Sequence, residues 1–277
     1  MGSMKFSIIT PVHAWHKDKI KQLERCVSSV QNQSFKDYEH IIIDDGSKKN
    51  IEFVSKYDKV IYKKCAHMER VTSYNTGMRM AKGDWFCFLD SDDEYFSYAL
   101  EAMNQMTEKN PDYKLFNFSS YHVNKNYGTI TKGPYMPKKL KVGHESFGRG
   151  NIVNGTFFFH RSIYDKLGGY PGDENGLIKD IDCSEVNYGK VRDLHMGSPW
   201  DFSAAFQLEF PEMRGHFMID RKTQPHKIIC ELGNPWGQDY ALFYKYTRKY
   251  HCKSYGIQLY IVHHNCKKEG EIHELAD

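Results

Sequence analysis

The feature that most constrains this chain is an acidic cluster, Asp90–Asp93 with the sequence D-S-D-D, placed directly after the apolar run Trp85–Leu89. The run has the length and aromatic content of a buried strand. Carboxylates at the end of such a strand are costly to desolvate, so the cluster needs a cation or water. Carboxylate oxygens suit Mg²⁺ or Mn²⁺, which commonly bridge a protein carboxylate to substrate phosphates. The alternative is a solvated acidic turn that caps the helix expected near Phe96.

Residues 5–96 alternate between apolar strands and helices. The run Glu39–Ile43 is continuously apolar at its centre, which is typical of a parallel strand covered on both faces. The expected strands are Lys5–Pro11, Glu39–Ile43, Val60–Tyr62 and Trp85–Leu89, and the expected helices are Lys17–Gln31, Ile51–Lys56 and Arg70–Ala81. This rhythm predicts an α/β fold with a parallel, doubly wound sheet.

Polar residues follow three of these strands, and their position predicts a shared site. Thr10-Pro11, Asp44-Asp45 and the acidic cluster each come at a strand's carboxyl end. In open parallel sheets, ligands bind in the crevice beyond these ends. We therefore expect the three segments to converge on one crevice.

Four motifs in order resemble family 2 glycosyltransferases of the GT-A fold. They are a strand ending in Thr10-Pro11, a strand ending in D-D-G-S at 44–47, the N-x-G of Asn75 and Gly77, and A-x-G-D-W-x-x-x-L-D-S-D-D from Ala81. The resemblance is dense over residues 5–96 and patchier beyond them. It implies a GT-A fold, Rossmann-like and mostly parallel, with helices on both faces and an elaborated C-terminal acceptor region.

The same resemblance divides the chain into parts. Residues 1–4 are interpreted as a cloning scar and the native start at Met4. Residues 5–125 form the nucleotide-sugar (donor) half, and residues 126–277 form the acceptor half. An insertion is expected at about 172–235, where recognisable pattern is sparse.

The acidic cluster matches the family's metal site. Asp92 matches the metal-ligating aspartate, which implies Mn²⁺ or Mg²⁺ as cofactor. Asp90 matches the residue that meets the sugar or ribose, and Ser91, between the two, is a further donor-binding candidate. Asp93 is a reserve ligand or a turn residue.

Asp45 matches the family position that contacts the base, and a carboxylate can accept a hydrogen bond from a uracil N–H. Uridine is therefore the expected nucleotide. Asp44 is expected at the ribose or as a turn residue, and Arg70 at the base or diphosphate or as a surface arginine. The remaining donor-binding candidates are Thr10, Pro11 and Asn75.

The transfer also needs a base to deprotonate the acceptor hydroxyl. The family carries Glu-Asp at the start of a helix, and the best match here is Gln238-Asp239, in which Gln238 departs from the usual Glu. Asp239 is the candidate base; its alternative role is a helix N-terminal carboxylate. The competing carboxylates are Asp173, Glu174, Asp180, Asp182 and Glu185.

A C-terminal histidine completes the metal shell in some GT-A enzymes. The expected strand Ile257–Val262 is followed by His263 and His264. His264 is the candidate ligand and His263 the fallback, and the alternative for either is a structural histidine.

Net charge, hydropathy and cysteine content limit the cellular locations and the binding partners that we expect for the protein. The net charge of +3 does not indicate a nucleic-acid partner. No stretch approaches the roughly 18 to 20 apolar residues of a membrane span. Seven scattered cysteines favour reduced thiols, so a cytoplasmic location is expected.

These observations lead to one functional hypothesis with two alternatives. The hypothesis is a metal-dependent, inverting transfer of a sugar from a nucleotide-diphosphate sugar, UDP-linked, to an acceptor hydroxyl. The acceptor stays open among polysaccharide, lipid-linked sugar, protein and modified DNA base. The alternatives are a sugar-1-phosphate nucleotidyltransferase, which would want a Gly-rich basic loop that residues 10–15 lack, and a non-catalytic nucleotide-sugar-binding module.

Overall fold

The structure is a computed structural model of the chain. This structure describes residues 4–67, 70–124, 129–132, 139–140, 154–170, 217–219, 227–230 and 235–264. Within them, a large sheet follows the order β3-β2-β1-β4-β9-β6-β13-β5, with β7 paired to β6 and β8 paired to β13. Its strands are β1 (Phe6–Val12), β2 (Tyr38–Asp45), β3 (Val60–Cys65), β4 (Trp85–Phe88), β5 (Glu94–Tyr95), β6 (Leu115–Asn124), β7 (Thr129–Lys132), β8 (Lys139–Leu140), β9 (Phe157–His160) and β13 (Cys252–His264).

The sheet is mostly parallel, as predicted. Strands β1 to β4 are parallel to one another, and β13 is parallel to β6. Strand β9 lies between β4 and β6 and runs antiparallel to both. Strands β1 to β4, β6 and β13 therefore all run in the same direction. Their carboxyl ends therefore share one edge of the sheet.

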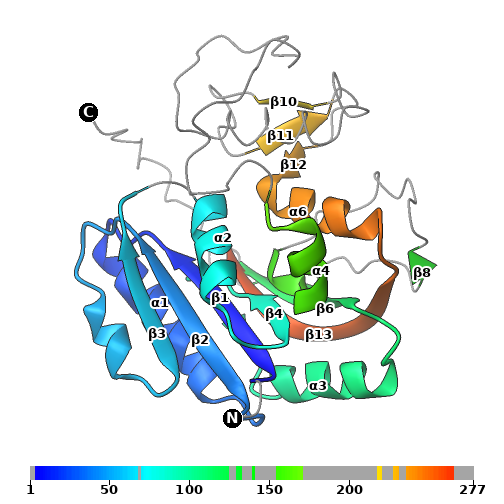
Figure 1. Cartoon of the computed structure of the whole chain (residues 1–277). Coiled ribbons are helices and arrows are strands. Elements are labelled where there is room, and N and C mark those ends of the chain that lie inside the picture. The colour runs from blue at the N-terminus through cyan, green and yellow to red at the C-terminus, as the bar shows by residue number, and fades with distance from the viewer. Residues whose placement is uncertain are drawn as a thin grey trace.

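Helices cover both faces of this sheet (Figure 1). One face packs against α1 (Lys17–Gln31) and α3 (Ala99–Lys109), and the other against α2 (Arg70–Met80), α4 (Arg161–Leu167) and α6 (Gln238–Thr247). Side chains alternate between the two cores as the pleat requires. In β9, Phe158 packs on the α1/α3 side, whereas Phe157 and Phe159 pack on the α2/α4/α6 side.

Several boundaries match the sequence prediction, and others are extended by pairing. Helix α1 has the predicted limits, and 310-helix η1 (Glu52–Lys56) lies where a short helix was expected. Strand β13 spans 13 residues, longer than the predicted 257–262, because β6 pairs along most of its length. The polar residues of β13 take part in strand pairing, although they do not form the continuous apolar run from which a buried strand is predicted.

The remaining elements are short. The 310-helix η2 (Asn154–Thr156) leads into β9, and a small antiparallel sheet joins β10 (Phe217–Ile219), β11 (Lys227–Cys230) and β12 (Pro235–Gly237). Most of the insertion expected at 172–235 lies outside the described residues. No helix in the described part is long and apolar enough to cross a membrane.

Candidate active site

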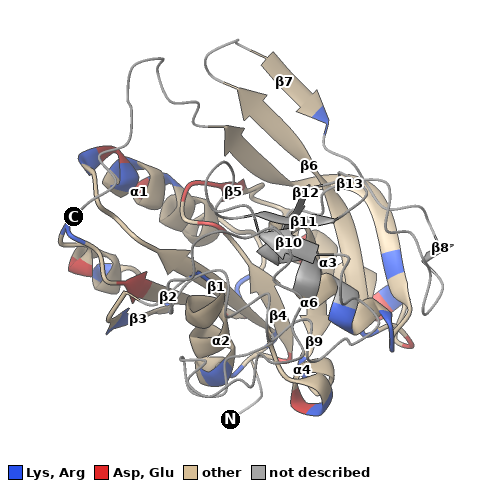
Figure 2. Cartoon of the chain, turned by 90° about the horizontal axis from the view of Figure 1, so that it is seen from above, with Lys and Arg blue, Asp and Glu red and all other residues tan. Residues whose placement is uncertain are grey.

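Strand register aligns the three polar segments at one edge of the sheet. Val12 pairs with Asp44 between β1 and β2, and Ile9 pairs with Phe88 between β1 and β4. The Leu89 N–H continues the second ladder by donating to the Ile9 carbonyl at 3.1 Å. Asp90, one residue on, is therefore level with the end of β1. Figure 2 shows acidic segments at the end of β2 and in the loop that enters β5.

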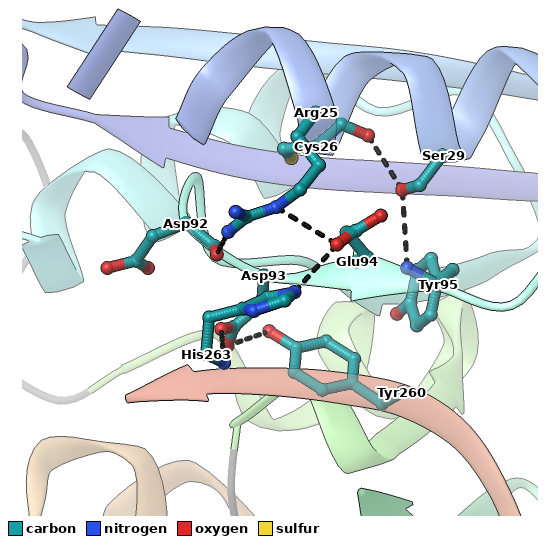
Figure 3. Close-up of polar contacts among 9 residues, drawn as sticks. All are labelled: Arg25, Cys26, Ser29, Asp92, Asp93, Glu94, Tyr95, Tyr260 and His263. Atoms are coloured by element: carbon teal, nitrogen blue, oxygen red, sulfur yellow. Dashed lines mark hydrogen bonds and ion pairs between the residues drawn. The ribbon is translucent and has the colours of Figure 1, made fainter. Parts of the chain in front are cut away.

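Asp93 points into the fold and fixes the acidic loop, which is the segment Asp90–Asp93 between β4 and β5. It is 4% exposed, and its carboxylate accepts hydrogen bonds from the Tyr260 hydroxyl at 2.8 Å and the His263 backbone N–H at 2.9 Å (Figure 3). Burial, with the nearby charges of Asp90 and Asp92, raises the pKa of the Asp93 carboxyl well above its usual range. These contacts fix the loop to β13 rather than cap a turn or helix, and metal ligation by Asp93 stays a prediction.

Arg25 of α1 holds the same loop from the other side. Its Nη2 donates to the Asp92 carbonyl, and its Nε lies 2.9 Å from Glu94 Oε1. His263 Nε2 lies 2.6 Å from the same Glu94 oxygen (Figure 3). The sequence analysis missed Arg25, because a charged residue on an amphipathic helix is normally solvated. Its contact with Asp92 joins residues 67 positions apart in the chain, so no local pattern predicts it.

The Asp92 side chain points away from this network (Figure 3). Its Oδ2 lies 3.3 Å from Lys19 Nζ, and the side chain is 31% exposed. A partly exposed carboxylate beside a lysine ammonium, at the carboxyl edge of the sheet, is suited to a hard divalent ion. The residues present therefore fit Mn²⁺ or Mg²⁺.

Asp90 lies among residues from α2 and β13. Its Oδ1 accepts a hydrogen bond from the Tyr74 hydroxyl, and its backbone N–H donates to the Tyr260 hydroxyl at 3.1 Å. Arg70 Nη1 lies 3.8 Å from the same Oδ1. Burial and the Asp90 charge raise the Tyr74 pKa, so its hydroxyl stays protonated and able to donate. Arg70 thus faces the acidic loop, although it begins a helix.

The two aspartates at the end of β2 have different surroundings. Both Asp44 oxygens are engaged, one by the Ser47 backbone N–H at 2.8 Å and the other by the Tyr62 hydroxyl at 2.7 Å. Asp44 therefore shapes the turn. Asp45 is 4% exposed, and its Oδ2 lies 2.9 Å from Nδ1 of His67, an exposed residue.

Three donor-binding candidates are buried in the fold. Thr10 is fully buried in β1, and its Oγ1 lies 2.9 Å from His40 Nε2. Pro11 is also buried in β1, one residue before its end. The Asn75 amide bonds both backbone groups of Tyr170, at 2.8 and 3.1 Å. A contact of these residues with a nucleotide stays a prediction, whereas their packing roles are visible.

The histidine pair at the end of β13 divides between opposite faces, because side chains alternate along a strand. His263 faces Glu94, and His264 Nε2 lies 2.8 Å from His122 Nδ1 of β6. Burial and His264 lower the pKa of His122. Among the described residues, Asp92 and His264 belong to no cluster of three potential ligands; His13, Asp45 and His67 do form one. Metal ligation by His264 stays a prediction.

Asp239 is the second residue of α6, which agrees with the helix start expected there. Leu242, Phe243 and Tyr246 of this helix pack in the same core as α2. The side chain of Asp239 lies outside the described part of the structure. So do the competing carboxylates Asp173, Glu174, Asp180, Asp182 and Glu185.

Comparison with known proteins agrees with this architecture. The chain is 32% identical over 168 residues to the poly(ribitol-phosphate) beta-N-acetylglucosaminyltransferase TarP of Staphylococcus aureus, covering 57% of this chain and 47% of that protein. It is 34% identical over 112 residues to the GalNAc(5)-diNAcBac-PP-undecaprenol beta-1,3-glucosyltransferase of Campylobacter jejuni, covering 36% of this chain and 34% of that one. The chain thus spans about half or less of the length of these relatives.

Solved structures support the fold. The structure of S. aureus TarS 1-349 in complex with UDP-GlcNAc matches with a TM-score of 0.54 at 15% identity, over 97% of this chain and 60% of that one. Full TarS matches with a TM-score of 0.56 at 13% identity, over 94% and 37%. Together with the sheet order, these matches confirm the GT-A fold. The model of the family described as "Glycosyl transferase family 2" matches residues 7–168, more than half of the chain, and the chain belongs to that family.

Proposed function

We propose that the chain is a metal-dependent, inverting glycosyltransferase that moves a sugar from a UDP-linked donor to an acceptor hydroxyl. One observation carries the proposal. In the loop beyond β4, Asp93 is turned inward and anchored while Asp92 is turned outward and partly exposed. A rigid loop that presents one carboxylate at the carboxyl edge of a parallel sheet is suited to hold a cation against a diphosphate.

The residues around the loop have complementary roles in this proposal. Asp92 holds Mn²⁺ or Mg²⁺, which when bound neutralises charge on the departing diphosphate. Asp90, oriented by Tyr74, contacts the sugar or ribose. Arg70, 3.8 Å from Asp90, adds a positive charge at the same edge.

Asp45 accepts a hydrogen bond from the base in this proposal. The carboxylate is nearly buried, so a uracil N–H aimed at it is recognised strongly and a base without a donor there is rejected. TarS was solved with UDP-GlcNAc, and TarP is named an N-acetylglucosaminyltransferase. UDP-GlcNAc is therefore the first donor to test.

Asp239 is proposed as the base that takes the proton of the acceptor hydroxyl. A single base opposite the leaving group permits one direct displacement, which inverts the anomeric centre. The acceptor is proposed only as a hydroxyl-bearing compound, with a glycan favoured by the printed activities of TarP and the C. jejuni relative.

The test of the proposal is Asp92→Asn, compared with Asp18→Asn on the exposed start of α1. We expect Asp92→Asn to abolish Mn²⁺-dependent UDP-GlcNAc hydrolysis and Mn²⁺-dependent UDP binding while leaving the circular dichroism spectrum unchanged. Asp18→Asn keeps both activities. A folded Asp92→Asn chain with near-normal turnover refutes the metal assignment. UDP binding by the wild-type chain with no turnover of any nucleotide sugar would favour a non-catalytic binding module.

A further inference from the structure

Three potential metal ligands meet outside the acidic loop, at the end of β2. His13 follows β1, Asp45 ends β2, and His67 lies two residues after β3. One ligand atom from each lies within 4.8 Å of the other two. Nδ1 of His67 is 2.9 Å from Asp45 Oδ2, and Nδ1 of His13 is 2.7 Å from the Asp45 backbone oxygen. Both imidazoles thus turn the same nitrogen toward one aspartate.

The backbone that carries these residues is held in place. Ser47 Oγ accepts from the Ala14 N–H at 2.8 Å, which ties the segment after β1 to the turn after β2. Gly46 has a φ of 68°, and a Cβ there would lie 2.7 Å from the His67 backbone nitrogen. A side chain at position 46 would push His67 away, so glycine allows its close approach. The three ligands are therefore brought together by the fold.

The side chains are also arranged so that they can close on an ion. The rings of His13 and His67 are stacked with centroids 4.4 Å apart, and one ring nitrogen of each lies within 4.8 Å of the other. The Asp45 side chain is 6% exposed, whereas that of His67 is 62% exposed. Because His67 is exposed, its imidazole can adjust beside the buried carboxylate and exchange the proton between Nδ1 and Asp45 for a metal ion, with metal–ligand distances of about 2.0 to 2.2 Å.

The donor set selects the kind of ion. Two imidazole nitrogens and one carboxylate oxygen, with water in the fourth position, suit Zn²⁺ and similar transition metals. They do not suit Mg²⁺, which prefers oxygen ligands. We propose that His13, Asp45 and His67 form a Zn²⁺ site whose occupation excludes the nucleotide base from Asp45. The second part rests on the proposed function, in which Asp45 reads the base.

The proposal gives two cation sites with opposite responses to UDP. UDP brings its phosphates to the ion at Asp92, so it strengthens Mn²⁺ binding there. UDP takes the Asp45 carboxylate from Zn²⁺, so it weakens Zn²⁺ binding. By linkage, Zn²⁺ weakens UDP binding by the same factor. Zinc would therefore act as an inhibitor that competes with the donor.

The first experiment uses no nucleotide. The whole chain, freed of metal with a chelator, is titrated with Zn²⁺ by calorimetry and with Co²⁺ by visible absorbance. We expect one strong site per chain, weakened at least about tenfold in His13→Gln and in His67→Gln, as expected for a lost ligand. His251→Gln, at an exposed position between α6 and β13, is the matched control and keeps wild-type affinity. Absence of Zn²⁺ and Co²⁺ binding, or wild-type affinity in folded His67→Gln, overturns the site.

The second experiment separates this site from the proposed function. UDP is added at increasing concentration to the Zn²⁺-loaded chain, and free Zn²⁺ is followed with a chromophoric chelator. Release of Zn²⁺ in proportion to bound UDP supports the overlap. If His13 and His67 hold Zn²⁺ but saturating UDP releases none, the metal site stands and the placement of the base at Asp45 is refuted.

Discussion

At the scale of single residues, neighbouring aspartates differ because their partners differ. Asp93 is buried and receives two donors, whereas Asp92 is partly exposed beside a lysine. Asp44 has both oxygens occupied by the turn, and Asp45 meets two histidines. The proposed ligand-binding roles therefore belong to Asp92 and Asp45, whereas Asp93 and Asp44 have both oxygens engaged within the fold.

Asp45→Ala should weaken UDP binding by about 1 to 3 kcal/mol, the range for leaving a buried hydrogen-bonding group unpaired. Calorimetry with UDP and with GDP measures it. Asp18→Ala on α1 is the exposed control. Unchanged UDP affinity, or a preference for GDP in the wild-type chain, would contradict the uridine assignment.

Asp239→Asn should lower kcat by roughly 10² to 10⁴, the usual contribution of a positioned base, with UDP affinity preserved. The reason is that, in the proposed mechanism, the base acts on the acceptor while the cation and nucleotide bind at other residues. Turnover with Mn²⁺ and calorimetry with UDP together measure the two effects.

Two outcomes would count against Asp239. Normal turnover would move the base to another carboxylate, with residues 173–185 as the next place to look. Loss of UDP binding together with turnover would show that Asp239 maintains the structure of α6.

At the scale of elements, the acidic loop is held between α1 and β13. Arg25 reaches it from α1, and Tyr260 and His263 reach it from β13. Strand β5 continues the loop and pairs with β13, Glu94 opposite Ile261. The position of the loop therefore depends on two elements that are distant in sequence. A substitution in either element should alter the position of Asp92 even where the substituted side chain does not contact the Asp92 carboxylate.

Arg25→Met should raise the Mn²⁺ concentration needed for half-maximal activity by about tenfold, in the range found when a residue supporting a metal ligand is lost. The substitution keeps the aliphatic stem and removes the donors to Asp92 and Glu94. Lys21→Met on the exposed side of α1 is the control. Arg25→Lys, which restores charge but not the fork geometry, should recover only part of the affinity. A lower kcat at an unchanged Mn²⁺ requirement would show that Arg25 does not position the acidic loop for metal binding.

At the scale of the whole molecule, a fully buried histidine links stability to pH. His40 of β2 contacts Thr10 of β1, and burial lowers its pKa from 6.5 to about 3. The unfolded chain binds a proton there below pH 6.5, whereas the folded chain stays neutral until about pH 3. Stability contributed by the neutral side chain is therefore complete above pH 6.5 and is lost as the pH falls from 6.5 toward 3.

Urea unfolding at pH 7 and pH 5 tests this linkage. His40 alone should cost about 2 kcal/mol of unfolding free energy between these values. His40→Gln, which can keep a bond to Thr10, should show a correspondingly smaller loss, and exposed His16→Gln should match the wild-type chain. Equal losses in wild-type and His40→Gln would contradict the assignment.

Local pattern determined much of this protein. Apolar periodicity is enough to locate α1 at Lys17–Gln31, and apolar runs that end in aspartates locate β2 and β4. The ordered motifs then indicated the family and the GT-A fold. These features are readable because hydrophobic spacing and turn residues act over a few neighbouring positions.

Long-range contacts decided the rest. The Asp93–Tyr260 hydrogen bond joins residues 167 positions apart and the Arg25–Asp92 hydrogen bond joins residues 67 apart, so no local sequence pattern predicts either contact. The same holds for the insertion of β9 between β4 and β6, and for the meeting of His13, Asp45 and His67. The sequence was enough to identify the candidate carboxylates. Which of them points inward and which can hold a ligand depends on side-chain burial and hydrogen-bond partners, and these exist only once the sheet has assembled.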